Sequence, residues 1–89
     1  MEAQSRVALI AIIVESPDSV LGVNELLHEY GRWIIGRMGI PYRERGVSII
    51  SVAIDAPQEI ISALSGKVGR LDRVSVKTAY SNVVSDGQA

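Results

Sequence analysis

The sequence predicts a small α+β domain whose strands and helices follow the order β-α-β-β-α-β. Twenty-two of the 89 residues are Ile or Val and none is Phe, and β-branched side chains favour strands over helices. The segment 14–20 recurs forty positions later as 54–60, each copy with an acid, a small residue and a Pro between apolar ends. Matching strand and helix patterns flank both copies, which indicates two β-α-β units in one domain.

The first unit begins with an almost unbroken apolar run from 6 to 14, which predicts a strand covered on both faces. Pro17 suits the first turn of a helix, where its missing N–H is not needed. Apolar residues at helical spacing then continue this helix to Gly31, a residue type that commonly ends helices. Residues 33–42 form the next strand, and their two Gly and one Pro favour an edge position in the sheet.

The second unit follows a charged turn at 43–46 that closes a hairpin. The third strand spans 47–54 and is again mostly apolar. Asp55 and Gln58 have the spacing of a capping box for a second helix, which is expected to end near Gly69.

Residues 73–79 alternate apolar and polar side chains and predict the fourth strand, at the second edge of the sheet. From Tyr80 onward the chain is small and polar and is expected to fray. The ordered core is therefore expected at 6–80 of a single domain, 1–89. An antiparallel four-stranded sheet with two helices on one face is the ferredoxin-like arrangement.

The other face of this sheet is left without helices. In the fourth strand the apolar side chains Val74 and Val76 are expected to face the helices. The positions about forty residues earlier in the second strand are assigned to the same face, which places Ile34, Gly36 and Met38 on the helix side. The open face then carries a mostly apolar set: Val7, Leu9, Ala11, Ile13, Trp33, Ile35, Val47, Ile49, Ser51 and Ala53. Because large exposed apolar surfaces usually mark an interface, these residues predict a homo-oligomer, a dimer or a tetramer.

Composition excludes several classes of function. Nine Lys and Arg against ten Asp and Glu leave no positive surplus for nucleic acid, and the central strands have no aromatic residue on which bases could stack. With no Cys and one His, neither a metal site nor a cofactor is expected. A polar, acid-containing start and the lack of a long apolar run predict a cytoplasmic protein without membrane contact.

Candidate ligand-binding side chains gather in the loop after the first strand and on the helix that follows: Ser16, Asp18, Ser19 and Asn24. Arg43 or Arg45 from a neighbouring chain would complete such a site. The charged hairpin cluster, Arg37, Arg43, Glu44 and Arg45, has two interpretations: it binds an anion or a partner, or it solvates the turn and blunts an edge strand, as such charges usually do.

His28 is the one candidate general base or metal ligand, and it has no second His or Cys as a partner. No nucleophile–base pair is evident in the sequence. The protein is therefore expected to be non-enzymatic, with a small enzyme built around an intersubunit site at His28 as the alternative.

Four strings of sequence resemble a known family. Residues 24–30, 37–42, 61–70 and 74–78, above all the Leu-Ser-Gly-Lys-x-Gly stretch within the third string, are similar to the iron-only hydrogenase system regulators. The resemblance implies an ACT-like oligomer, related in fold to the C-terminal domain of nickel-responsive repressors, with a regulatory role. Those repressors bind metal through His and Cys and bind DNA through a separate segment, and this sequence matches neither feature.

ACT domains typically bind an amino acid at a subunit interface, with Gly in the loop where this chain has residues 17–19, Pro-Asp-Ser. The resemblance therefore leaves ligand binding at this loop open. Taken together, the sequence predicts a regulatory homo-oligomer that binds a small molecule or a protein partner and is linked to iron-only hydrogenase maturation. A purely structural protein-interaction module is the other alternative.

Overall fold

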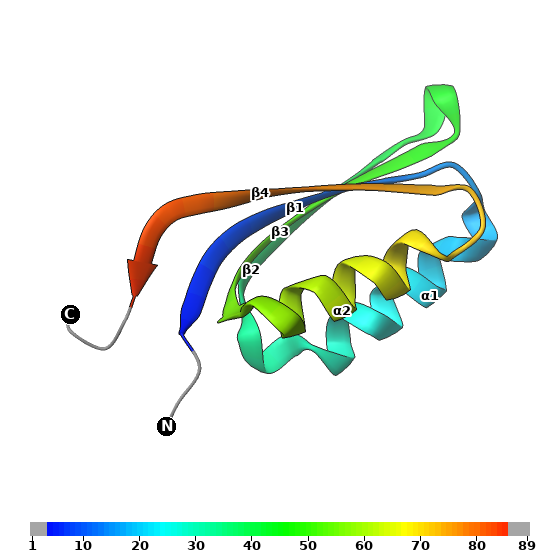
Figure 1. Ribbon diagram of the computed structural model, residues 1–89. Helices are drawn as coiled ribbons and strands as arrows, with labels where there is room; N and C mark the ends of the chain where they lie inside the picture. Colours follow the sequence, from blue (N-terminus) through cyan, green and yellow to red (C-terminus); the bar gives the residue numbers. More distant parts are fainter. Residues whose placement is uncertain (1–3, 86–89) are drawn as a thin grey trace.

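A four-stranded antiparallel sheet in the order β2-β3-β1-β4 forms one layer, and two helices cover one of its faces (Figure 1). The computed structural model describes residues 4–85. The main elements are β1 (Ser5–Val14), α1 (Pro17–Glu29), β2 (Ile34–Tyr42), β3 (Val47–Pro57), α2 (Gln58–Gly69) and β4 (Val74–Ser85), with short 3-10 turns at Gly31–Trp33 and Arg43–Arg45. The predicted element order, fold class and edge strands are confirmed.

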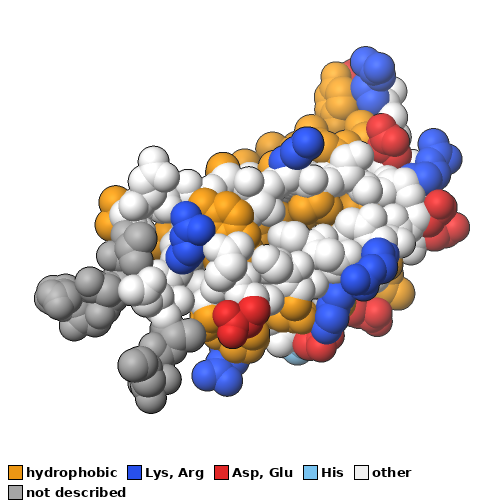
Figure 2. Space-filling model, viewed as in Figure 1, with side chains coloured by type: hydrophobic (Ala, Val, Ile, Leu, Met, Phe, Trp, Pro, Cys, Tyr) orange, Lys and Arg blue, Asp and Glu red, His pale blue; other side chains and the backbone are white. Residues whose placement is uncertain are grey.

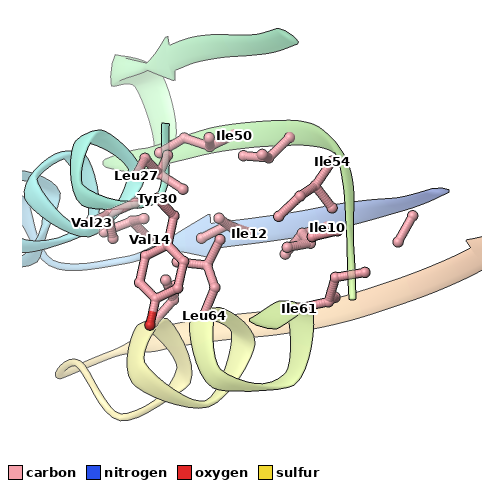
Figure 3. Packing of buried hydrophobic residues seen from close by; sticks show 14 residues of the cluster. Ile10, Ile12, Val14, Val23, Leu27, Tyr30, Ile50, Ile54, Ile61 and Leu64 are labelled. Atoms are coloured by element: carbon pink, nitrogen blue, oxygen red, sulfur yellow. The ribbon is translucent and has the colours of Figure 1, made fainter. Parts of the chain in front are cut away.

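The core lies between the sheet and the helices, and it is built almost wholly from aliphatic side chains (Figure 3). In the two central strands, β1 and β3, the residues expected to face the helices are all at most 5% exposed: Ile10, Ile12, Val14, Ile50, Val52 and Ile54. Both helices bury residues at three- or four-residue spacing, such as Val23 and Leu27 in α1, as an amphipathic helix on a sheet requires.

The predicted phase of β2 is correct at Ile34 and wrong at Gly36 and Met38. Ile34 pairs with Ile54, but the next pair is Gly36 with Ala53, so the register shifts at Ile35. One extra residue in a strand reverses the faces of all residues that follow it. Gly36 and Met38 therefore lie on the open face, opposite residues of β3 that also face away from the helices.

Trp33 was expected on the open face, and this expectation is also wrong. It ends the 3-10 turn before β2, is partly buried and packs against the core cluster. Its ring lies 5.8 Å from the ring of Tyr30, and the guanidinium of Arg32 lies 4.9 Å from its ring centroid. The turn places Trp33 before the strand alternation begins.

The capping box predicted at the start of α2 does not form. β3 continues through Asp55 to Pro57, and α2 begins without a side-chain cap. The side chain of Gln58 instead forms hydrogen bonds with the strands β4 and β1: its Nε2 donates to the Tyr80 hydroxyl at 2.8 Å, and its Oε1 accepts from Arg6 at 2.9 Å. The sheet therefore extends three residues further than expected before the helix begins.

β4 also runs past Tyr80, where the sequence predicted fraying, and continues to Ser85. Arg6 on the neighbouring strand β1 fixes this extension, because its guanidinium lies 4.6 Å from the Tyr80 ring centroid and donates to the Ser81 carbonyl at 3.2 Å. The last four positions, 86–89, lie outside the described residues.

Candidate functional site

A groove lies between α1 and the β2–β3 hairpin, and the register shift in β2 creates it. After the shift at Ile35, the large apolar side chains of β2 lie on the open face. The alternate residues, Arg37, Gly39 and Pro41, therefore face the helix layer. These residues leave a cleft of about 230 Å³ beside the first half of α1. Its lining includes Val20, Asn24, Arg37, Gly39, Pro41 and Ser48.

A second cleft of about 370 Å³ continues the first toward the tip of the hairpin. The two share Val20, Pro41 and Ser48, and the second reaches Pro17 and Arg43. We call the two together the α1–hairpin groove. The hairpin tip rises away from the helices (Figure 1), and basic and apolar side chains meet there on the surface (Figure 2).

The charge of the α1–hairpin groove is one-sided. Arg37 lines one end and Arg43 the other, whereas no Asp or Glu is among the lining residues in the described part of the chain. The Nη2 of Arg37 donates a 2.7 Å hydrogen bond to Oδ1 of Asn24 on α1. A guanidinium held by a neutral amide keeps its full positive charge, so this groove favours anions.

Two of the six predicted ligand-binding residues, Asn24 and Arg43, line this groove. Within the groove Arg43 and Asn24 come from the same chain, and an arginine contributed by a neighbouring chain stays a prediction. Arg37 was not among the predicted ligand-binding residues, although the sequence placed it in a hairpin cluster with anion binding as one interpretation. The shift that turns Arg37 toward α1 has no signal in the sequence beyond the nearby glycines.

The other predicted site residues lie elsewhere. Ser19 is 7% exposed, and its hydroxyl donates to the Asp72 carbonyl at 2.7 Å, while the Ser16 carbonyl accepts from the Ser19 N–H at 3.0 Å. The Ser19 hydroxyl and the Ser16 backbone carbonyl therefore hold the start of α1 in place, and the Ser16 side chain makes no capping hydrogen bond. Asp18 is exposed on the first turn of α1.

Arg45 lines a different hollow, of about 420 Å³, with Glu15 and Arg73. Glu15 donates its backbone N–H to the Arg73 carbonyl at 2.9 Å, which closes this end of the sheet. This hollow adjoins the α1–hairpin groove, because it shares Tyr42, Gly46 and Val47 with the second cleft, but Arg45 lines neither cleft of the groove itself.

His28 is exposed on α1. Within residues 4–85, no three His, Cys, Asp or Glu side chains lie close enough together to hold a metal ion. Neither described helix is long and apolar enough to cross a membrane.

The open face of the sheet carries large exposed apolar side chains from three strands. Val7, Leu9 and Ile49 are between 40% and 48% exposed, and the register shift adds Met38, Ile40 and Tyr42 from β2. The remaining residues predicted for this face, apart from Trp33, are in place on β1 and β3, and Ile35 is exposed at the shift itself.

Residues 6–78 match the model of a protein family, the TM1266-like iron-only hydrogenase system regulators. The chain belongs to this family. Its member TM1266 from Thermotoga maritima has a solved structure that is 36% identical in sequence, covers 85% of this chain and 96% of its own, and superposes with a TM-score of 0.82. The resemblance seen in the sequence is thereby confirmed, and the family's description assigns it a regulatory role.

More distant structures share the fold alone. A formyltetrahydrofolate deformylase from Pseudomonas putida KT2440 is 13% identical, with 86% of this chain and 29% of that chain covered, at a TM-score of 0.63. The de novo designed protein Foldit4 is 19% identical, with 89% and 98% covered, at a TM-score of 0.58. No curated protein matches this chain.

Proposed function

We propose that this protein is a non-enzymatic regulator of the iron-only hydrogenase system that works as a homo-oligomer and binds a small-molecule effector or a protein partner. The open apolar face of the sheet is the observation that carries the proposal. A monomer would leave this face in water, and contiguous apolar surfaces of such extent usually mark interaction sites.

The size of the open face suits a second copy of the chain. Four strands about 4.8 Å apart and ten residue pairs at about 3.3 Å per residue give a projected area of about 600 Å². The accessible surface of side chains exceeds their projection. A standard interface buries about 800 Å² on each partner, so the whole face could serve as one side of a dimer.

The relief of the open face also suits an identical partner. Two pairs on the open face join a large side chain to a small one, Leu9 with Ala53 and Met38 with Ser51, whereas Ile49 lies between two large neighbours. Two copies related by a two-fold axis present the same patch to each other, so raised side chains of one copy can enter the low regions of the other. Lys77 on the edge strand β4 supplies a polar border.

A non-enzymatic role is consistent with the setting of His28. It is exposed on α1, and no cluster of three metal-ligating side chains in the described residues includes it. A His28→Ala variant should keep the regulatory effect on hydrogenase expression or activity. Loss of that effect in a folded variant would favour the enzyme alternative.

Sedimentation equilibrium at micromolar concentration tests the assembly. We expect the wild type to sediment as a dimer or tetramer of the 9.6 kDa chain, and Leu9→Lys to shift it to monomer, because a charge would be buried at the interface. Leu21→Lys is the matched control, since Leu21 is 66% exposed on α1, away from the sheet.

Circular dichroism of each variant separates loss of assembly from loss of folding, and Leu9→Ser offers a milder change at the same position. A wild type that sediments at 9.6 kDa, or folded Leu9 variants that remain oligomeric, would refute assembly through the open face.

A further inference from the structure

We infer that the α1–hairpin groove binds a small organic carboxylate, with Arg37 pairing the carboxylate and the apolar walls holding an aliphatic body. This inference names the chemical class of the small-molecule effector, and it rests on the proposed function only in assuming that such an effector exists. It does not depend on assembly, because the groove lies on the helix side of the sheet and the proposed interface on the opposite side.

Arg37 is prepared to receive a carboxylate. Guanidinium groups offer five donors in a planar fork that matches the two carboxylate oxygens. One donor nitrogen, Nη2, is already bonded to Asn24 Oδ1 at 2.7 Å, which fixes the plane of the fork and leaves further donors for a ligand. With no acidic side chain lining either cleft in the described chain, no internal anion competes for this position.

The walls beside Arg37 select for an apolar body. Val20 of α1, Pro41 of β2 and Ile50 of β3 line the same cleft, and the hydroxyl-bearing Ser48 lies between the two clefts. A volume of about 230 Å³ equals that of about eight water molecules at about 30 Å³ each. A short branched aliphatic acid matches this combination, whereas inorganic phosphate would leave the apolar walls unoccupied.

Gly39 provides an independent way to test the groove. It lines the first cleft, and a Cβ built on it would meet no other atom within 4 Å. A larger side chain at Gly39 should therefore occupy open space in the groove without forcing the core apart. Gly39→Val is thus a variant that blocks the groove and leaves Arg37 in place.

The experiment is an NMR titration of the ¹⁵N-labelled full chain with 4-methylpentanoate, with 4-methylpentanamide as its uncharged counterpart. We expect saturable shifts at Asn24, Gly39 and Ser48 with the acid, and binding at least tenfold weaker with the amide. Arg37→Gln and Gly39→Val should each weaken binding of the acid at least tenfold. Arg32→Gln is the matched control, because that guanidinium packs on the Trp33 ring, and it should bind as the wild type does.

The inference would be overturned by the absence of saturable shifts with up to 20 mM acid, by equal affinity for the amide, or by undiminished binding of the acid by folded Arg37→Gln. Inorganic phosphate binding as tightly as the acid at the same amides would instead show general anion binding and would also overturn it. Sedimentation of the same samples reports assembly separately, so failure of this inference and failure of the oligomer proposal are distinguishable.

Discussion

Arg37 on the edge strand β2 donates a 2.7 Å hydrogen bond to Asn24 in the middle of α1. This bond joins the outermost strand to the helix layer at the point where the chain leaves an open groove. It also sets the orientation of one of the two positive groups that line the groove.

Changing Asn24 should therefore alter binding more than stability. Asn24→Ala removes an exposed hydrogen bond, which contributes at most about 0.5–1 kcal/mol to folding, while 4-methylpentanoate should bind several-fold more weakly because the guanidinium is no longer held. Asn24→Asp should go further, because the new carboxylate would neutralise Arg37 and compete with the ligand. The same NMR titration measures both effects, and wild-type affinity in Asn24→Asp would contradict this role for Asn24.

The fold could be predicted from the sequence because the β-α-β pattern occurs twice, forty residues apart. The recurrence of an acid, a small residue and a Pro just before each helix predicts where both helices begin, and the aliphatic runs of β1 and β3 predict a core that the structure confirms. The forty-residue offset predicts the wrong faces for the residues of the second strand after Ile35, because this strand has a register shift at that point.

The shift at Ile35 could not be predicted, because both faces of the neighbouring strands are apolar. A one-residue slip then exchanges one hydrophobic face for another and leaves little trace in the pattern. The same slip explains why Arg37 was not among the predicted ligand-binding residues. Asn24 and Arg43 were predicted by residue type and position, whereas Arg37 reaches the groove only because the strand is out of phase.

Ser19 is a structural residue, and its replacement should cost stability. Its buried hydroxyl donates to the Asp72 carbonyl at 2.7 Å, linking the first turn of α1 to the loop before β4. Ser19→Ala leaves this carbonyl without its partner and should lower the free energy of unfolding by about 1–2 kcal/mol in urea titrations. Ser62→Ala, at an exposed position of α2, should change it by less than about 0.5 kcal/mol. Equal effects of the two variants would contradict the role given to Ser19.

Lys67 should make the protein more sensitive to alkaline pH. The pKa of Lys67 is raised from its usual value of 10.5, first by hydrogen bonding with the Tyr30 side chain and then by the electrostatic interaction with it. The Lys67 ammonium also lies 5.1 Å from the Tyr30 ring centroid, and the Tyr30 oxygen points toward α2 (Figure 3).

Because the folded-state pKa is raised, the stability that this contact contributes is fully present below pH 10.5 and is lost as the pH rises through the folded pKa. Lys67→Met should therefore lose less stability than the wild type between pH 10 and pH 12. Tyr30→Phe keeps the ring and removes the hydroxyl, so NMR titration of the Lys67 ammonium should show a lower pKa in that variant. An unchanged pKa would contradict the assignment of Tyr30 as the cause.

Gly46 is the residue that closes the β2–β3 hairpin, and its backbone requires glycine. It has φ 66° and ψ 29°, in the left-handed region, where an L side chain brings Cβ too close to the following carbonyl at a cost of about 1–2 kcal/mol. Gly46→Ala should lower the unfolding free energy by about 1 kcal/mol, and Gly46→Asn by less, because Asn tolerates this conformation.

Gly31→Ala is the control that isolates the backbone effect at Gly46. A Cβ at either glycine would meet no other atom within 4 Å, but only Gly46 has a positive φ among the two. Alanine at Gly31 should therefore be neutral or slightly stabilising, since it reduces the entropy of the unfolded chain. A loss at Gly31 as large as that at Gly46 would mean that the hairpin does not depend on the left-handed residue. The tip that carries Arg43 to the groove would then be held by other contacts.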